Sequence, residues 1–116
     1  MSDRTLTMSL LFDFFGDLLP KKQREYFDLY HNDDLSLSEI AELSGISPQG
    51  VRDAIKKAET ALREYEKKTG VVARFEEMRR NVSSLEGTAR HLEEITEGEA
   101  SKLAGTIVRG LHQLKG

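Results

Sequence analysis

Two consecutive helix signals joined by one glycine constrain this chain more than any other feature. Ser36 is followed three residues later by Glu39, which is the capping-box pattern that begins a helix. Gly45 stands where that helix should end, because glycine readily adopts the left-handed backbone that follows a helix. Ser47 and Pro48 form the next start signal, a capping side chain followed by a proline in the first turn. The sequence therefore predicts a short helix, a tight turn and a second helix.

Apolar residues recur at helical spacing on both predicted helices. The short helix has an apolar face made of Leu37, Ile40, Ala41 and Leu43. The second helix should run from residue 47 to residue 68, with an apolar face made of Val51, Ala54, Ile55, Ala58, Leu62 and Tyr65. We expect Ile46, in the turn, to point back into the core. This is the plan of a helix-turn-helix, whose second helix usually enters the major groove of DNA.

Two further helices are predicted before this pair. The first should run from Leu6 to about Leu19, with an apolar stripe made of Leu10, Leu11, Phe14, Phe15, Leu18 and Leu19. Pro20 opens the second, and residues 32–34, Asn-Asp-Asp, form a turn after it. Seven of the eight aromatic residues precede Gly70, and large rings bury the most area per residue. The main core should therefore lie in the amino-terminal part.

The pattern changes after Gly70. Apolar residues now alternate at spacings of three and four, at Phe75, Met78, Val82, Leu85, Ala89 and Leu92. This stripe is too short for a long coiled coil, so we expect packing against another helix. Residues 96–101 are the predicted break, and a last helix carries Leu103, Ile107, Val108, Leu111 and Leu114. We predict a helix-turn-helix domain over residues 1–70 and a carboxy-terminal helical arm over residues 71–116.

The composition favours an all-α protein of the cytoplasm. The chain has 116 residues with only two prolines, and alternation of β-branched residues is almost absent. It has no cysteine, which fits a reducing compartment and excludes disulfides and thiolate metal sites. Acidic residues at Asp3, Asp13 and Asp17 interrupt the amino-terminal apolar run, so we expect neither a secretory signal nor a membrane span.

The net charge of −3 restricts any binding to nucleic acid. Residues 1–35 carry four basic against seven acidic residues, whereas residues 36–70 and 71–116 are each balanced. Proteins dedicated to nucleic acid usually carry a basic surface, because neutralising phosphates supplies much of the affinity. A surface of that kind must be local here, and a protein-binding module is the alternative.

One face of the second predicted helix is a candidate for this local surface. The nucleic-acid candidates are Gln49, Arg52, Lys56, Lys57 and Arg63. Arg52 can pair with guanine and Gln49 with adenine, while the lysines can reach phosphates. Asp53 shares this face and would repel phosphate unless it accepts from a cytosine amine or pairs with a neighbouring lysine. The alternative is a solvated charged face that binds nothing.

A second set of candidates concerns partner contacts. Phe12 lies outside the apolar stripe of the first helix, so the apolar surface there is wider than one core face requires. The candidates for a partner or dimer contact are Phe12, Phe75, Met78, Val82 and Leu85. We predict a homodimer. The alternative is that all of these side chains pack inside one subunit.

Patterns typical of catalysis, metals or cofactors are missing from the sequence. His31, His91 and His112 stand far apart, and no His-Glu-x-x-His pattern is present. No serine lies in a nucleophile-elbow pattern, and no glycine-rich loop follows a strand. We therefore predict a protein that is not an enzyme and that needs no metal or cofactor.

Two family resemblances rest on these segments. The run LPKKQREYFDLY together with LSLSEIAELSGISPQGVRDAIKKAETALRE resembles region four of bacterial sigma-70-type factors, which reads promoter DNA. Residues 4–68 resemble the YlxM (p13-like) helix-turn-helix family of Gram-positive bacteria, through the LFDF start, KQREYFDLY, DDLSLSEIA and the EYEKK end. Members of that family often read SRQAVYDNI where residues 47–55 here read SPQGVRDAI, so base preference does not transfer directly.

The YlxM resemblance implies an accessory or regulatory role beside the signal recognition particle. This link comes from the family's gene neighbourhood, which includes the particle's GTPase components. The implied partners are the particle's GTPase protein or its RNA. The competing function is a sequence-specific DNA-binding transcriptional regulator that uses Gln49, Arg52, Lys56 and Lys57, and a third is a pure dimerisation module.

Overall fold

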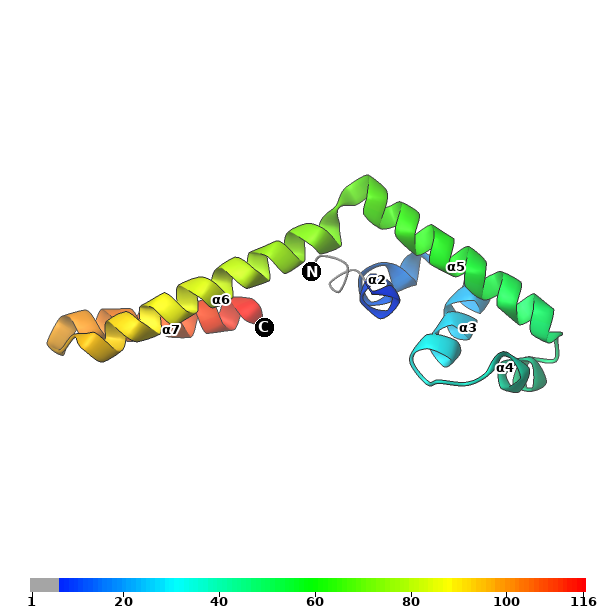
Figure 1. The fold of residues 1–116 in the computed structure, drawn as a ribbon, viewed down its shortest axis with the longest axis horizontal. Helices are drawn as coiled ribbons and strands as arrows, with labels where there is room; N and C mark the ends of the chain where they lie inside the picture. Colours follow the sequence, from blue (N-terminus) through cyan, green and yellow to red (C-terminus); the bar gives the residue numbers. More distant parts are fainter. Residues whose placement is uncertain (1–6) are drawn as a thin grey trace. The chain divides into compact units, whose positions relative to one another are not determined.

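A computed structural model describes residues 7–116, and within them the protein is all helical with no strand. The elements are α2 (Met8–Phe15), the 3-10 helix η1 (Gly16–Leu18), α3 (Lys21–His31), α4 (Leu37–Ser44), α5 (Pro48–Thr69), α6 (Val71–Ile95) and α7 (Gly98–Lys115) (Figure 1). The predicted all-α class is confirmed. The chain divides into two compact units, residues 1–73 and residues 74–116, which we describe separately.

The helix-turn-helix signals form the expected hydrogen bonds. The Glu39 amide donates to Ser36 Oγ over 3.0 Å, and the Ser36 amide donates to Glu39 Oε1 over 2.8 Å. Gly45 ends α4 in the left-handed region with φ 76°. Ser47 Oγ then accepts from the Gly50 amide over 3.0 Å at the start of α5. The capping box, the glycine turn and the second cap are all confirmed.

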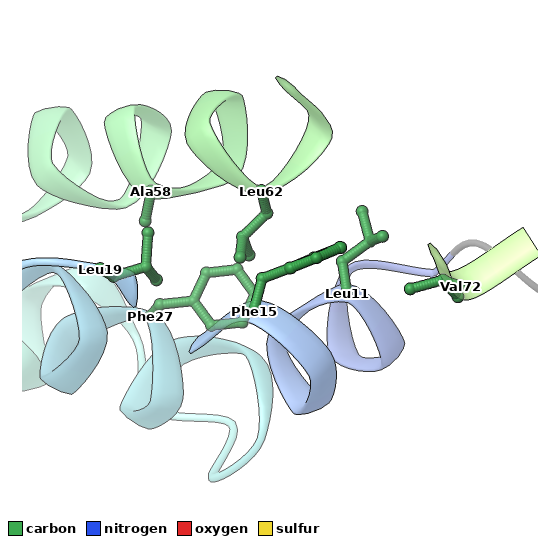
Figure 2. Close-up of a cluster of buried hydrophobic side chains, with 7 residues drawn as sticks. All are labelled: Leu11, Phe15, Leu19, Phe27, Ala58, Leu62 and Val72. Carbon is green, nitrogen blue, oxygen red and sulfur yellow. The ribbon is translucent and has the colours of Figure 1, made fainter. Parts of the chain in front are cut away.

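Helices α2, α3 and α4 of the first unit all pack on α5. One buried cluster, drawn in Figure 2, joins α5 to α2, α3 and the start of α6 through Leu11, Phe15, Leu19, Phe27, Ala58, Leu62 and Val72. A second cluster joins α5 to α3 and α4 through Tyr26, Ile40, Ala41, Val51 and Ile55. Both clusters use the predicted apolar face of α5, so packing against it orients α3, α4 and α2.

The first helix is shorter than predicted. Helix α2 ends at Phe15, and the tighter turn η1 follows it. This turn brings Leu19 into the core, where it is 5% exposed, and leaves Leu18 62% exposed. Gly16 permits the turn because a Cβ there would lie 3.1 Å from the Phe12 ring. The predicted starting residue, Leu6, lies outside the described residues.

Two side chains expected in the core lie near its edge instead. Leu43 is 72% exposed, because α4 has only two turns and packs through Ile40 and Ala41. Ile46 is 41% exposed and covers the first turn of α5, where its Cδ1 would meet a Cβ at Gly50 at 3.4 Å. The core face predicted for this region is therefore too wide, because it includes Leu43 and Ile46.

A buried carboxylate joins the end of α5 to the start of α6. Gly70 ends α5 in the left-handed region with φ 64°, and α6 begins at the next residue. Glu66, 9% exposed, accepts hydrogen bonds of 2.9 Å from the Val72 amide and 2.9 Å from the Ala73 amide. These two amides are free donors at a helix amino terminus, so Glu66 caps α6 from the preceding helix.

In the second unit α6 and α7 form an antiparallel hairpin (Figure 1). Its buried apolar residues are Val82, Ala89, Ala104 and Val108. The break between the helices is shorter than the predicted 96–101, because α7 already begins at Gly98, whose φ is +66°. Gly105 leaves room for the side chain of Glu93, since a Cβ there would lie 2.8 Å from Glu93 Oε2.

The predicted leucine stripes of this hairpin face solvent. Residues at least 44% exposed are Met78, Leu85, Leu92, Ile95, Leu103, Ile107 and Leu114. Of the predicted α6 stripe, only Val82 and Ala89 are buried. The buried contact between the two helices is made through small side chains. Within the hairpin, the prediction that the α6 stripe packs against another helix holds for Val82 and Ala89.

Glu86 holds the hairpin together, and periodicity alone did not indicate it. Its side chain is 6% exposed and lies 2.7 Å from Lys115 Nζ, 2.7 Å from Arg90 Nη2 and 3.4 Å from His112 Nδ1. Hydrogen bonds from Lys115 and Arg90 lower the pKa of Glu86 from 4.5 to about 2, against the opposing effect of burial. The carboxylate therefore stays ionised and joins α6 to the end of α7.

Candidate nucleic-acid interface

The candidate interface is the face of α5 that is turned away from the packed helices. Burial of Val51, Ile55, Ala58 and Leu62 against the first unit fixes the rotation of α5 about its axis. The opposite side is exposed at every predicted contact residue, namely Gln49, Arg52, Lys56, Lys57 and Arg63. The predicted contact residues therefore all lie on the exposed side of α5.

The four cations of this face are available to a ligand. Arg52, Lys56, Lys57 and Arg63 make no ion pair with any other residue in the described range. Arg24 differs from them, since it lies 3.3 Å from Asp17. An exposed, unpaired cation keeps its charge for a phosphate, so this face is a local basic surface on an acidic chain.

Two residues of the face are coupled to each other. Gln49 Nε2 donates to Asp53 Oδ1 over 3.0 Å, one helical turn away. Neither lysine of the face lies within ion-pair distance of Asp53 among the described residues. Gln49 would therefore have to break its hydrogen bond with Asp53 in order to pair with an adenine.

A shallow cleft opens beside the cations. It has a volume of about 170 Å³ and is lined from α3, α4 and α5 by Tyr30, Leu37, Arg52, Ile55, Lys56 and Glu59. The one acid in its lining is engaged, since Glu59 Oε2 lies 2.7 Å from His31 Nε2 on α3. This contact holds the Glu59 carboxylate against α3. Sequence reasoning missed it, because the two residues are far apart along the chain.

The predicted partner contacts fall in different surroundings. Phe12 is half-buried against the aromatic core of the first unit, and Val82 is buried between α6 and α7. Phe75 is half-buried on α6. Met78 is 44% exposed and Leu85 is 56% exposed. The exposed members of this set therefore lie on α6.

Other kinds of site find little support in the described range. No three His, Asp or Glu side chains between residues 7 and 116 come together as metal ligands. None of the helices in this range is both long and apolar enough to cross a membrane.

Comparison with known proteins assigns the chain to a family. Residues 2–101 match the family described as helix-turn-helix proteins, YlxM / p13 like. A UPF0122 protein of Thermoanaerobacter sp. strain X514 is 42% identical over 98% of both chains. One from Caldanaerobacter subterraneus subsp. tengcongensis is 48% identical over 73% of each chain, and one from Halalkalibacterium halodurans is 53% identical over 66% of this chain and 70% of its own. The capped turn, the orientation of α5 and these matches agree, and the chain belongs to the YlxM / p13-like helix-turn-helix family.

Proposed function

We propose that this protein is a regulatory protein and not an enzyme, and that it binds nucleic acid through the exposed face of α5. In this proposal it works in the cytoplasm as an accessory component of the signal recognition particle pathway. Its ligand in this proposal is the particle's RNA. The alternative within the same pathway is docking on the particle's GTPase protein, and the binding experiment described below distinguishes the two.

The observation that carries the proposal is the unpaired basic surface of α5. Arg52, Lys56, Lys57 and Arg63 are exposed and have no acidic partner among the described residues, although the chain as a whole is acidic. On a helical wheel Arg52, Lys56 and Arg63 lie within about 40° of one another, and cations of this kind contact phosphate oxygens. The family's gene neighbourhood beside the particle's GTPase components supports the targeting context.

A second candidate is a sequence-specific regulator that binds duplex DNA. The order of α4, a glycine turn and α5 favours it, because this arrangement places the second helix in the major groove. The deep, narrow major groove of A-form RNA does not admit a helix. Contact with particle RNA would therefore use phosphates and unpaired loops, whereas contact with DNA would also use Arg52 and Gln49 on base edges.

The test is a salt series of binding to three ligands, namely the particle's RNA, its GTPase protein and random duplex DNA. We expect tight, salt-dependent binding to the RNA and weak binding to the duplex. Lys56→Ala should lower the salt slope by about one, because it removes one phosphate contact. Arg80→Ala is the matched control, since Arg80 is an exposed cation on α6.

The other outcomes are equally informative. Binding to duplex DNA alone, with base preference relaxed by Arg52→Ala, would replace the proposal with the DNA-binding regulator. Binding to the GTPase protein that Lys56→Ala leaves unchanged would move the function to protein docking. Equal loss in Lys56→Ala and Arg80→Ala would show that net charge acts, and not the face of α5.

A further inference from the structure

The second unit has a small apolar core. Its apolar core consists of two valines and two alanines, at Val82, Ala89, Ala104 and Val108. A unit of 43 residues lies near the size below which folding usually needs a disulfide, a metal or oligomerisation. The chain has no cysteine, and the described residues form no metal cluster. Burial of apolar surface against another molecule would therefore add to a small core.

The hairpin carries an apolar groove that provides such a surface. The groove has a volume of about 280 Å³ and is lined from both helices by Leu85, Thr88, Ala89, Leu92, Ile107 and Leu111. Leu92 and Ile107 on its two sides are 44% and 51% exposed. Ile95, Leu103 and Leu114 extend the same faces and are at least 59% exposed. Monomeric proteins seldom expose so many large aliphatic side chains in one place.

Charge is absent from this face and concentrated on the other. Projected on a helical wheel, the groove side over residues 81–95 of α6 consists of Asn81, Ser84, Leu85, Thr88, Leu92 and Ile95, and on α7 it consists of Ala100, Leu103, Ile107, Gly110, Leu111 and Leu114. No Lys, Arg, Asp or Glu belongs to either stretch. The groove on the other side is lined by Arg90, Glu93, Arg109 and His112.

From these observations we infer that the occupant of the apolar face is the same face of a second copy of this chain. A neutral surface can meet itself without like-charge repulsion, which a face of one sign could not do. The need for burial exists in every copy at all times, and a second copy is always present with the first. Two hairpins joined about a two-fold axis give a four-helix bundle, a common way to complete a helical core.

The bundle adds a function that is separate from the ligand of α5. The dimer would carry two basic α5 faces, so that two binding surfaces act together. The inference concerns the hairpin alone, and it stands or fails independently of the proposed function.

The experiment is the mass of the full-length chain in solution as a function of concentration. We expect the wild-type protein to have about twice the 13.1 kDa of one chain. Leu92→Glu and Ile107→Glu place charges on the neutral face and should give monomers. Ser83→Glu is the matched control, because Ser83 is an exposed residue of α6 outside the face, and it should remain dimeric.

A milder pair of variants covers the case in which the glutamates prevent folding. Alanine is a good helix former, so Leu92→Ala and Ile107→Ala should not disturb the helices. Each should raise the dimer dissociation constant roughly tenfold or more, while Ser83→Ala should leave it unchanged. A wild-type mass of one chain at all concentrations would overturn the inference. Dimers that persist equally in the face variants and in the control would overturn it as well.

Discussion

The two units use the same apolar periodicity in opposite ways. In the first unit the largest side chains are inside, and Phe27, Ile40, Leu62, Val51 and Val72 are all under 2% exposed. In the second unit the buried positions hold valines, alanines, one glycine and one carboxylate, while all leucines and isoleucines except the half-buried Leu111 are exposed. A helical apolar stripe predicts that a helix is amphipathic, and it leaves open which surface the stripe will contact.

The reason for the difference lies in the number of helices available. In the first unit α2, α3 and α4 surround α5 with apolar faces, so large side chains find partners inside one chain. The hairpin has only two helices, and one carboxylate with two cations and a histidine occupies part of the contact between them. Each of the following changes tests this contrast.

The largest effect is expected at the centre of the first unit. Phe27 is fully buried and stacks on Phe12 with ring centroids 4.8 Å apart. Phe27→Ala should lower the free energy of unfolding by about 3–5 kcal/mol, because it leaves a cavity that rigid helices cannot fill. Urea unfolding followed by helicity measures it. Leu18→Ala, at a residue 62% exposed, should change it by less than about 0.5 kcal/mol.

The next effect concerns the cap between α5 and α6. Glu66→Ala removes the acceptor of two backbone amides and should cost about 2–3 kcal/mol, because buried donors are left without partners. Glu64→Ala on the same helix is the control, since Glu64 is exposed. Equal stability of the two variants by urea unfolding would contradict the assigned role of Glu66.

A smaller, pH-dependent effect is expected in the second unit. The partners Arg90 and His112 are 56% and 71% exposed, so solvent weakens their ion pairs with Glu86. The folded pKa of Glu86, about 2, lies below its ordinary value of 4.5. The carboxylate therefore contributes stability above pH 4.5, and this contribution is lost as the pH falls toward 2.

Glu86→Gln isolates this contribution. The variant should have a lower Tm than the wild type at pH 7, and the difference should disappear between pH 4.5 and pH 2. Thermal unfolding at a series of pH values measures it, with Glu94→Gln as a control at an exposed acid of α6. A Tm difference that does not depend on pH would show that Glu86 acts through packing and not through charge.

The smallest effect is a gain in stability at the start of α5. Gly50 is helical, and a Cβ there would have Ile46 and Ser47 at an ordinary contact distance of 3.4 Å. Gly50→Ala should therefore raise the free energy of unfolding by about 0.5–1 kcal/mol. Gly45→Ala should have the opposite sign, because φ of 76° is strained for any residue with a Cβ. Chemical denaturation of the two variants compares them directly.

The sequence by itself determined the local features of the fold. Ser36 with Glu39, Gly45 and Ser47 act on backbone groups within a few residues, so they predicted where α4 ends and α5 begins. Periodicity likewise predicted the buried face of α5, and with it the exposure of Arg52, Lys56, Lys57 and Arg63 on the opposite side. These predictions succeeded because each depends on neighbours in the chain.

The tertiary structure decided everything that depends on distant neighbours. The burial of Glu86 requires Lys115 and His112, which arrive only when α7 folds back on α6. The position of the Glu59 carboxylate likewise depends on its contact with His31 of α3. Which apolar stripe is covered depends on which helix lies beside it. Contacts of this kind are chosen by the packing of whole elements, and side-chain spacing along one helix carries no information about them.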